Sequence, residues 1–72
     1  MMAFTQPAAV YLHVMPIEFR KQINGLSLLV QDAMLLDVFS SSLFVFMNRP
    51  RTRIKILYWD KNGFCLWLKR LE

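Results

Sequence analysis

The feature that most constrains this 72-residue chain is the stretch from Phe44 to Arg70. Apolar, β-branched and aromatic runs are interrupted there by two turn signals, at 48–52 and at 60–63. Pro50 fixes the backbone in the first signal, and Asn62-Gly63 accepts the positive φ that a tight hairpin requires. The stretch therefore predicts three consecutive antiparallel strands, at 43–47, 53–59 and 64–70.

The residues before this stretch predict one strand and one helix. Residues 8–14 are rich in strand formers and end before Pro16, which favours a first strand. From 16 to 34 the apolar residues recur at alternating spacings of four and three, the pattern of an amphipathic helix of about four to five turns. Residues 1–7 are expected to form a loose lead-in.

This order of elements, β-α-β-β-β, predicts a single small α+β domain over residues 1–72. We expect a four-stranded, mostly antiparallel sheet with the helix packed on one face. Whether the first strand pairs beside the second or beside the fourth stays open. Within the third strand, Ile54, Ile56 and Tyr58 are expected to face the helix. The opposite face of that strand then carries Arg53, Lys55, Leu57 and Trp59.

The composition limits the setting in which the chain works. A hydrophobic fraction of 56% is more than so short a chain can bury, which favours a partner surface such as a second copy. No apolar run approaches the roughly 18 residues of a membrane helix. The first residues lack the pattern of a secretory signal, so the expected compartment is the cytoplasm.

The positive charge is concentrated in the predicted meander. Residues 1–48 carry two basic and three acidic side chains, whereas residues 49–72 carry seven basic and two acidic ones. A one-sided basic surface favours a polyanionic partner such as DNA. The candidate phosphate contacts are Arg49, Arg51, Arg53, Lys55, Lys61, Lys69 and Arg70, with Arg20 and Lys21 as a second anion contact. Trp59 and Trp67 are the candidate aromatic residues of a partner face.

Residues for catalysis or metal binding are sparse. His13 has no second histidine to act with, so a locally hydrogen-bonded imidazole is the better interpretation. The single cysteine, Cys65, excludes an internal disulfide and is expected to be a small apolar strand residue. The five acidic residues are explained as helix, turn and terminal positions. We therefore expect no enzyme, no metal and no cofactor.

Two blocks of the chain carry a family resemblance. Trp59-Asp60-x-Asn62-Gly63-Phe64-x-Leu66-Trp67, preceded by the arginines at 49, 51 and 53, is the more specific block; the other is Met15-Pro16-Ile17-Glu18-Phe19-Arg20-Lys21. Together they resemble the TnpB-type accessory proteins, encoded by the second open reading frame of bacterial insertion sequences of the IS66 class. Pro50 interrupts what is usually a denser arginine run in that family.

The resemblance implies an accessory role in transposition beside a larger transposase, and it brings no catalytic residues. Two molecular tasks remain open at this point. The chain binds DNA through a basic sheet face and the arginine turn, or it is a protein-interaction module that associates with itself or with the larger transposase.

Overall fold

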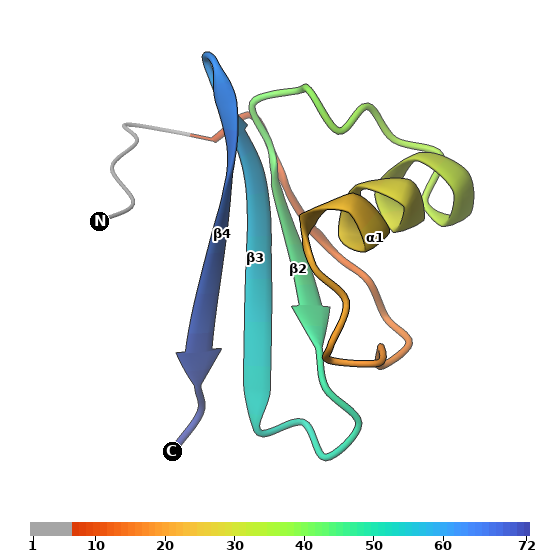
Figure 1. The fold of residues 1–72 in the computed structure, drawn as a ribbon, viewed down its shortest axis with the longest axis vertical. Coiled ribbons are helices and arrows are strands. Elements are labelled where there is room, and N and C mark those ends of the chain that lie inside the picture. The colour runs from red at the N-terminus through yellow and green to blue at the C-terminus, as the bar shows by residue number, and fades with distance from the viewer. Residues whose placement is uncertain (1–6) are drawn as a thin grey trace.

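Four strands form one sheet in the order β1-β2-β3-β4 in the computed structural model, which describes residues 7–72 (Figure 1). The strands are β1 (Val10–Leu12), β2 (Leu43–Met47), β3 (Arg53–Asp60) and β4 (Gly63–Arg70). The predicted fold class is confirmed: β2, β3 and β4 form an antiparallel meander, and β1 pairs with β2 in parallel. The open question about the first strand is thereby answered in favour of β2. The predicted lead-in lies, apart from Pro7, outside the described residues.

The strand predictions differ from the structure mainly at the edges. β2 has the predicted bounds, β3 extends one residue further to Asp60, and β4 begins one residue earlier at Gly63. β1 is shorter than predicted, but backbone hydrogen bonds between Ala8 and Ser41 and between His13 and Val45 continue the pairing on either side of it. The hairpin is confirmed, although its positive φ falls on Lys61 rather than on Asn62 or Gly63.

The helix is shorter than predicted, and the prediction of a helix over residues 16–22 is wrong. Helix α1 (Ile23–Leu28) continues as a π-helical segment, η1 (Leu29–Ala33), and no residue from 16 to 22 is helical. Instead, the Ile17 amide donates to the carbonyl oxygen of Met47 and the Ile17 side chain is buried. Pairing with the end of β2 therefore holds this segment extended. Phe19 fits the apolar spacing that predicted the helix, but it is a loop residue that packs against the core.

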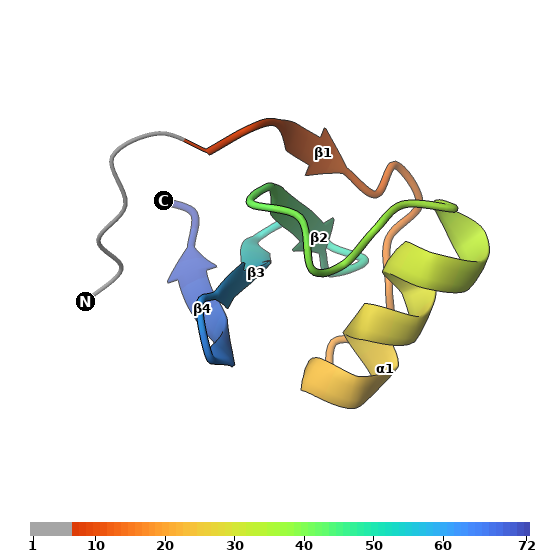
Figure 2. The same cartoon turned by 90° about the horizontal axis from the view of Figure 1, so that it is seen from above.

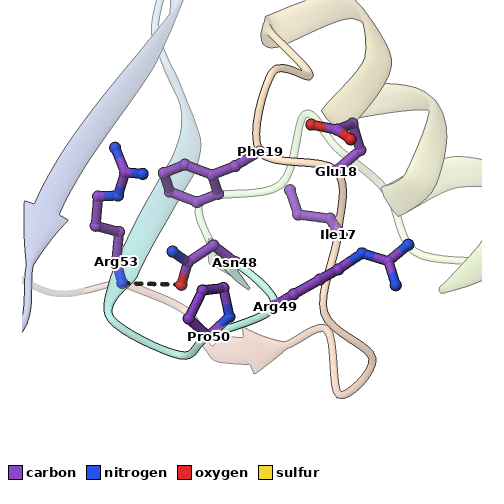
Figure 3. Close-up of a pocket in the computed structure, with 7 residues that line it drawn as sticks. All are labelled: Ile17, Glu18, Phe19, Asn48, Arg49, Pro50 and Arg53. Atoms are coloured by element: carbon purple, nitrogen blue, oxygen red, sulfur yellow. Dashed lines mark hydrogen bonds between the residues drawn. The ribbon is translucent and has the colours of Figure 1, made fainter.

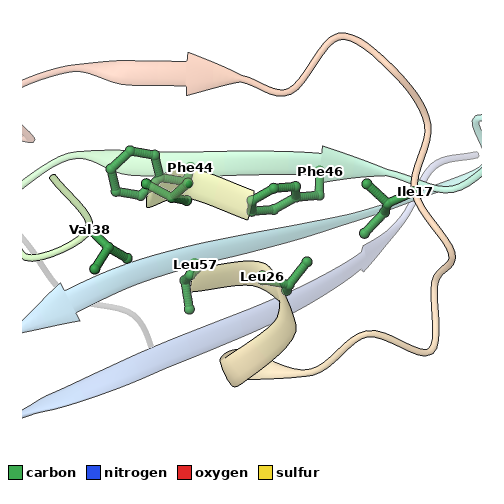
Figure 4. Packing of buried hydrophobic residues seen from close by; sticks show 7 residues of the cluster. Ile17, Leu26, Val38, Phe44, Phe46 and Leu57 are labelled. Atoms are coloured by element: carbon green, nitrogen blue, oxygen red, sulfur yellow. The ribbon is translucent and has the colours of Figure 1, made fainter. Parts of the chain in front are cut away.

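The core lies between the sheet and the helical segment (Figure 4). Leu26 and Val30 are fully buried on the sheet-facing side of the helical segment, and Phe44, Phe46 and Leu57 meet them from the sheet. Burying large aromatic and aliphatic side chains in one cluster is the main stabilising term for so small a fold. The predicted helical spacing is correct for the part of the pattern that follows residue 22.

The two faces of β3 are the reverse of the prediction. The register pairs Phe44 with Leu57 and Phe46 with Lys55, so Lys55 and Leu57 face the helix together with the two phenylalanines. Ile54, Ile56 and Tyr58 lie on the other face. β3 carries apolar residues on both faces, so strand alternation alone does not decide which face meets the helix. Lys55 can lie on the helix side because its ammonium group has hydrogen-bond partners there.

We call the face opposite to α1 the open face. It is formed by Val10 and Leu12 of β1, the odd-numbered residues of β2 and β4, and the even-numbered residues of β3. Viewed along the sheet, α1 and the connection after it lie on one side, and no helix of residues 7–72 covers the open face (Figure 2).

Candidate nucleic-acid interface

The connection between β2 and β3 presents arginines from a backbone that one side chain holds in place. The Asn48 side chain is buried, and its Oδ1 accepts hydrogen bonds from the amides of Thr52 and Arg53 at 2.9 Å each. Its Nδ2 lies 3.0 Å from the Thr52 hydroxyl oxygen, to which it donates. Arg51 takes a positive φ of 61° in this connection, and its amide donates to the Asn48 carbonyl. Arg49 and Arg51 are consequently exposed on a defined turn.

Other basic residues come to the same end of the sheet. Arg53 pairs with Arg70, and Ile54 pairs with Lys69, because β4 ends where β3 begins. Arg20 and Lys21 belong to the loop before α1, which packs over the start of β3. The basic end therefore comprises the exposed residues Arg20, Lys21, Arg49, Arg51, Arg53, Lys69 and Arg70. Topology collects them from segments up to about 50 positions apart in the sequence.

The basic end contains a shallow hollow of about 200 Å³. Its lining is Ile17, Glu18, Phe19, Asn48, Arg49, Pro50 and Arg53, and the close-up shows Arg49 and Arg53 reaching to opposite sides of it (Figure 3). The Arg53 guanidinium carbon lies 5.3 Å from the centre of the Phe19 ring. Two guanidinium groups at the rim of a hollow provide planar donors that suit phosphate oxygens.

Two exposed carboxylates moderate the charge of the basic end. Glu18 lies 3.4 Å from Arg20, and Glu72 lies 2.7 Å from Arg70. The Arg20 amide hydrogen bond and the charges of Arg20 and Arg49 hold the pKa of Glu18 below its usual value. Because both ion pairs are exposed, they contribute little to stability and can exchange for a stronger anion.

Lys55 is a structural residue, which corrects its place among the candidate phosphate contacts. Its Nζ donates to the carbonyl oxygens of Phe19 at 2.6 Å and Lys21 at 2.8 Å, and it lies 4.7 Å from the centre of the Phe19 ring. The residue is buried, and burial and the charge of Arg53 lower its pKa. The ammonium group thus fastens the loop before α1 to β3. The sequence gives no signal of this role, because the partners of Lys55 are backbone carbonyl oxygens and an aromatic ring of a loop more than 30 positions earlier.

Three further candidates, Lys61, Trp59 and Trp67, do not belong to the basic end. Lys61 lies in the β3–β4 hairpin at the opposite end of the sheet. Trp59 and Trp67 lie on opposite faces, so they do not form one aromatic surface. Trp59 packs edge-on against Phe39 and Phe64, at centroid distances of 5.0 and 4.9 Å. Trp67 lies on the open face and is 39% exposed.

The remaining candidates for chemistry have structural contacts. His13 Nδ1 lies 2.7 Å from the Met15 carbonyl oxygen, and the imidazole packs at 5.6 Å from the Phe46 ring, as the local interpretation requires. Cys65 is a free, partly exposed residue of the open face. Two effects raise the pKa of Tyr58 to about 12: mainly its hydrogen bond with Cys65, and secondly its burial. Among residues 7–72, no three His, Cys, Asp or Glu side chains are grouped to hold a metal ion.

Within the described part of the chain, no helix has the length and apolarity needed to cross a membrane. The fold and the basic end define the class of the protein: a small α+β module whose positive charge is gathered at one end of a four-stranded sheet.

Comparison with known proteins identifies the family of this module. Residues 8–72 match the family described as "IS66 Orf2 like protein", and the chain belongs to that family. The predicted resemblance is therefore confirmed, and the family implies an accessory protein of an insertion sequence.

Two curated relatives come from Sinorhizobium fredii (strain NBRC 101917 / NGR234). "Uncharacterized protein y4jC" is 40% identical over 57 residues, which cover 79% of this chain and 49% of the relative. "Uncharacterized protein y4hO" is 31% identical over 67 residues, which cover 93% of this chain and 58% of the relative. The chain thus spans about half the length of these relatives. No solved structure matches the chain.

Proposed function

We propose that the chain binds DNA through the phosphates that its basic end contacts, and that it does so as a non-catalytic accessory protein of transposition. The observation that carries the proposal is the gathering of Arg49, Arg51, Arg53 and Arg70 at one end of the sheet, joined by Lys69 and by the second anion contact of Arg20 and Lys21. Transposition acts on DNA, so we expect the protein in the cytoplasm beside it.

The proposed phosphate contacts would position the protein on the DNA duplex without reading its base sequence. Arginine forks and exposed lysines bind phosphate oxygens and carry no sequence information by themselves. The hollow between Arg49 and Arg53 is the phosphate site that we propose within the basic end, because the Asn48 side chain fixes the backbone at Arg53. We therefore expect binding that depends weakly on base sequence and strongly on salt.

A salt series tests this proposal. Fluorescence anisotropy with a labelled duplex, repeated at several salt concentrations, gives the slope of log affinity against log salt. Contacts with about four phosphates give a slope near −3.6, at about 0.9 per phosphate. Binding that is absent at low salt, or that does not change with salt, would reject DNA as the partner of the basic end and would leave the family assignment intact.

The open face favours a second candidate function, that of a protein-interaction module. Val10 and Leu12 are 62% and 52% exposed on it, although both are aliphatic. Exposed contiguous apolar surface is typical of a protein-protein contact. A second copy of the chain and the larger transposase are the two partners to consider. Co-purification of the chain with its element's larger transposase, compared with sedimentation of the chain alone, separates these partners.

A further inference from the structure

The open face has an apolar centre and one charge of each sign at its two ends. Asp60 lies at the hairpin end, where it pairs with Gly63, and Lys69 lies at the basic end, where it pairs with Ile54. Between them the face carries aliphatic side chains together with Cys65 and Trp67, while Tyr58 on the same face is buried. A surface of this kind is complementary to itself when one copy is turned end for end.

We propose that a second copy of this chain docks on the open face, sheet against sheet, with the two copies antiparallel. The two-fold axis then crosses the strands halfway along the sheet. Each Lys69 comes to the level of the partner's Asp60, and the aliphatic centres face one another. This inference makes the second candidate function specific, and it does not depend on DNA binding.

The charge distribution selects this orientation. A two-fold axis parallel to the strands would place the basic ends of both copies side by side, and their like charges would repel in the absence of DNA. An axis across the strands separates the basic ends by the length of the molecule, whose longest dimension is 32 Å. The same turn replaces repulsion between two Lys69 side chains by two Lys69–Asp60 attractions.

The antiparallel dimer has a consequence that rests on the proposed DNA binding. Its two basic ends point in opposite directions, because each lies at one end of the long axis. One dimer then offers two separate phosphate-binding ends, so it can contact two DNA segments or bind one segment at each end.

Paired substitutions at equally exposed leucines test whether the open face is the interface. Leu12 on the open face is 52% exposed, and Leu28 on the outer side of α1 is 56% exposed. We expect sedimentation equilibrium at tens of micromolar to show a dimer for the native chain and for Leu28→Glu, and a monomer for Leu12→Glu. A monomeric native chain, or a dimer that resists Leu12→Glu, would overturn the proposal. Circular dichroism of both variants checks that they are folded.

Charge reversal tests the antiparallel register. Each single variant, Asp60→Lys or Lys69→Glu, turns two attractive pairs into repulsive ones and is expected to weaken dimerisation by about tenfold. The double variant Asp60→Lys/Lys69→Glu restores the pairs and is expected to return the dissociation constant to within about threefold of the native value. Additive losses in the double variant would overturn the register.

A spin-label distance gives the orientation directly. In a Cys65→Ser chain, Arg51→Cys places one label on the exposed turn of the basic end. The antiparallel dimer places the two labels near opposite ends of the 32 Å long axis. A distance below about 20 Å, near the sheet spacing of about 10 Å plus two label arms, would show parallel stacking and overturn the orientation. Neither outcome bears on DNA binding, which the salt series measures.

Discussion

The two ends of β3 carry turns of opposite character. At the basic end the chain needs the buried Asn48 side chain to hold a wide connection, and that connection displays arginines. At the other end Lys61 and Asn62 close a two-residue hairpin between paired Asp60 and Gly63, with no buried side chain inside it. Both turns have a residue with positive φ and an exposed cation. The contrast teaches that Arg51 belongs to the basic end, and Lys61 does not, because of the residues that lie near each in space and not because of the local sequence.

Removing the Asn48 side chain is expected to have the largest effect, because it would disconnect the basic turn. Asn48→Ala deletes three hydrogen bonds and leaves the amides of Thr52 and Arg53 without the acceptor that the buried Asn48 side chain supplies. We expect a loss of about 2–4 kcal/mol in the free energy of unfolding. Urea denaturation followed by tryptophan fluorescence measures it.

The matched control for that change is Asn62→Ala in the hairpin, where the side chain is exposed. We expect a change below about 0.5 kcal/mol for this control. Equal losses in the two variants would contradict the difference between the turns.

Replacing Lys55 is expected to have the next largest effect on stability and little effect on DNA. Lys55→Met keeps the length of the side chain but removes the two hydrogen bonds to the loop before α1. We expect a loss of about 1–2 kcal/mol, moderated because the lysine no longer has to be buried with its charge. The salt slope of DNA binding should change by less than half a phosphate equivalent. A full loss of one phosphate contact without a change in stability would return Lys55 to the interface.

Relieving the backbone at the hairpin is expected to have the smallest effect, and in the stabilising direction. Lys61 has a φ of 49°, a region in which an L-residue with a side chain is disfavoured and glycine is not. Lys61→Gly should therefore raise the free energy of unfolding by up to about 1 kcal/mol. Thermal denaturation measures the gain, and a destabilised variant would show that the lysine side chain supports the hairpin.

Local signals account for the parts of the fold that the sequence predicts well. The meander follows from run lengths and turn residues that act within a few positions, such as Pro50 and Gly63. The helical spacing of Leu26 and Val30 likewise identifies the core side of the helix. The family resemblance rests on the same local blocks, which is why it could be stated before the structure.

The parts that the sequence does not predict depend on distant partners. Ile17 is extended because it pairs with the end of β2, about 30 positions later. Lys55 is buried because carbonyl oxygens of residues 34 and 36 positions away receive its ammonium hydrogens. Lys61 is excluded from the basic end by the direction of β3. In each case the sequence pattern is compatible with two placements, and tertiary contacts decide between them.

One comparison tests the DNA-binding claim most directly, because the two turns offer a matched pair of cations. Arg51 and Lys61 are both exposed turn residues, with φ values of 61° and 49°. Arg51→Gln and Lys61→Gln each remove one positive charge. In the anisotropy salt series we expect Arg51→Gln to reduce the magnitude of the slope by about 0.9, and Lys61→Gln to leave the slope at the native value. Equal reductions in the two variants would show that net charge, and not the basic end, determines the binding, and would contradict the proposed interface.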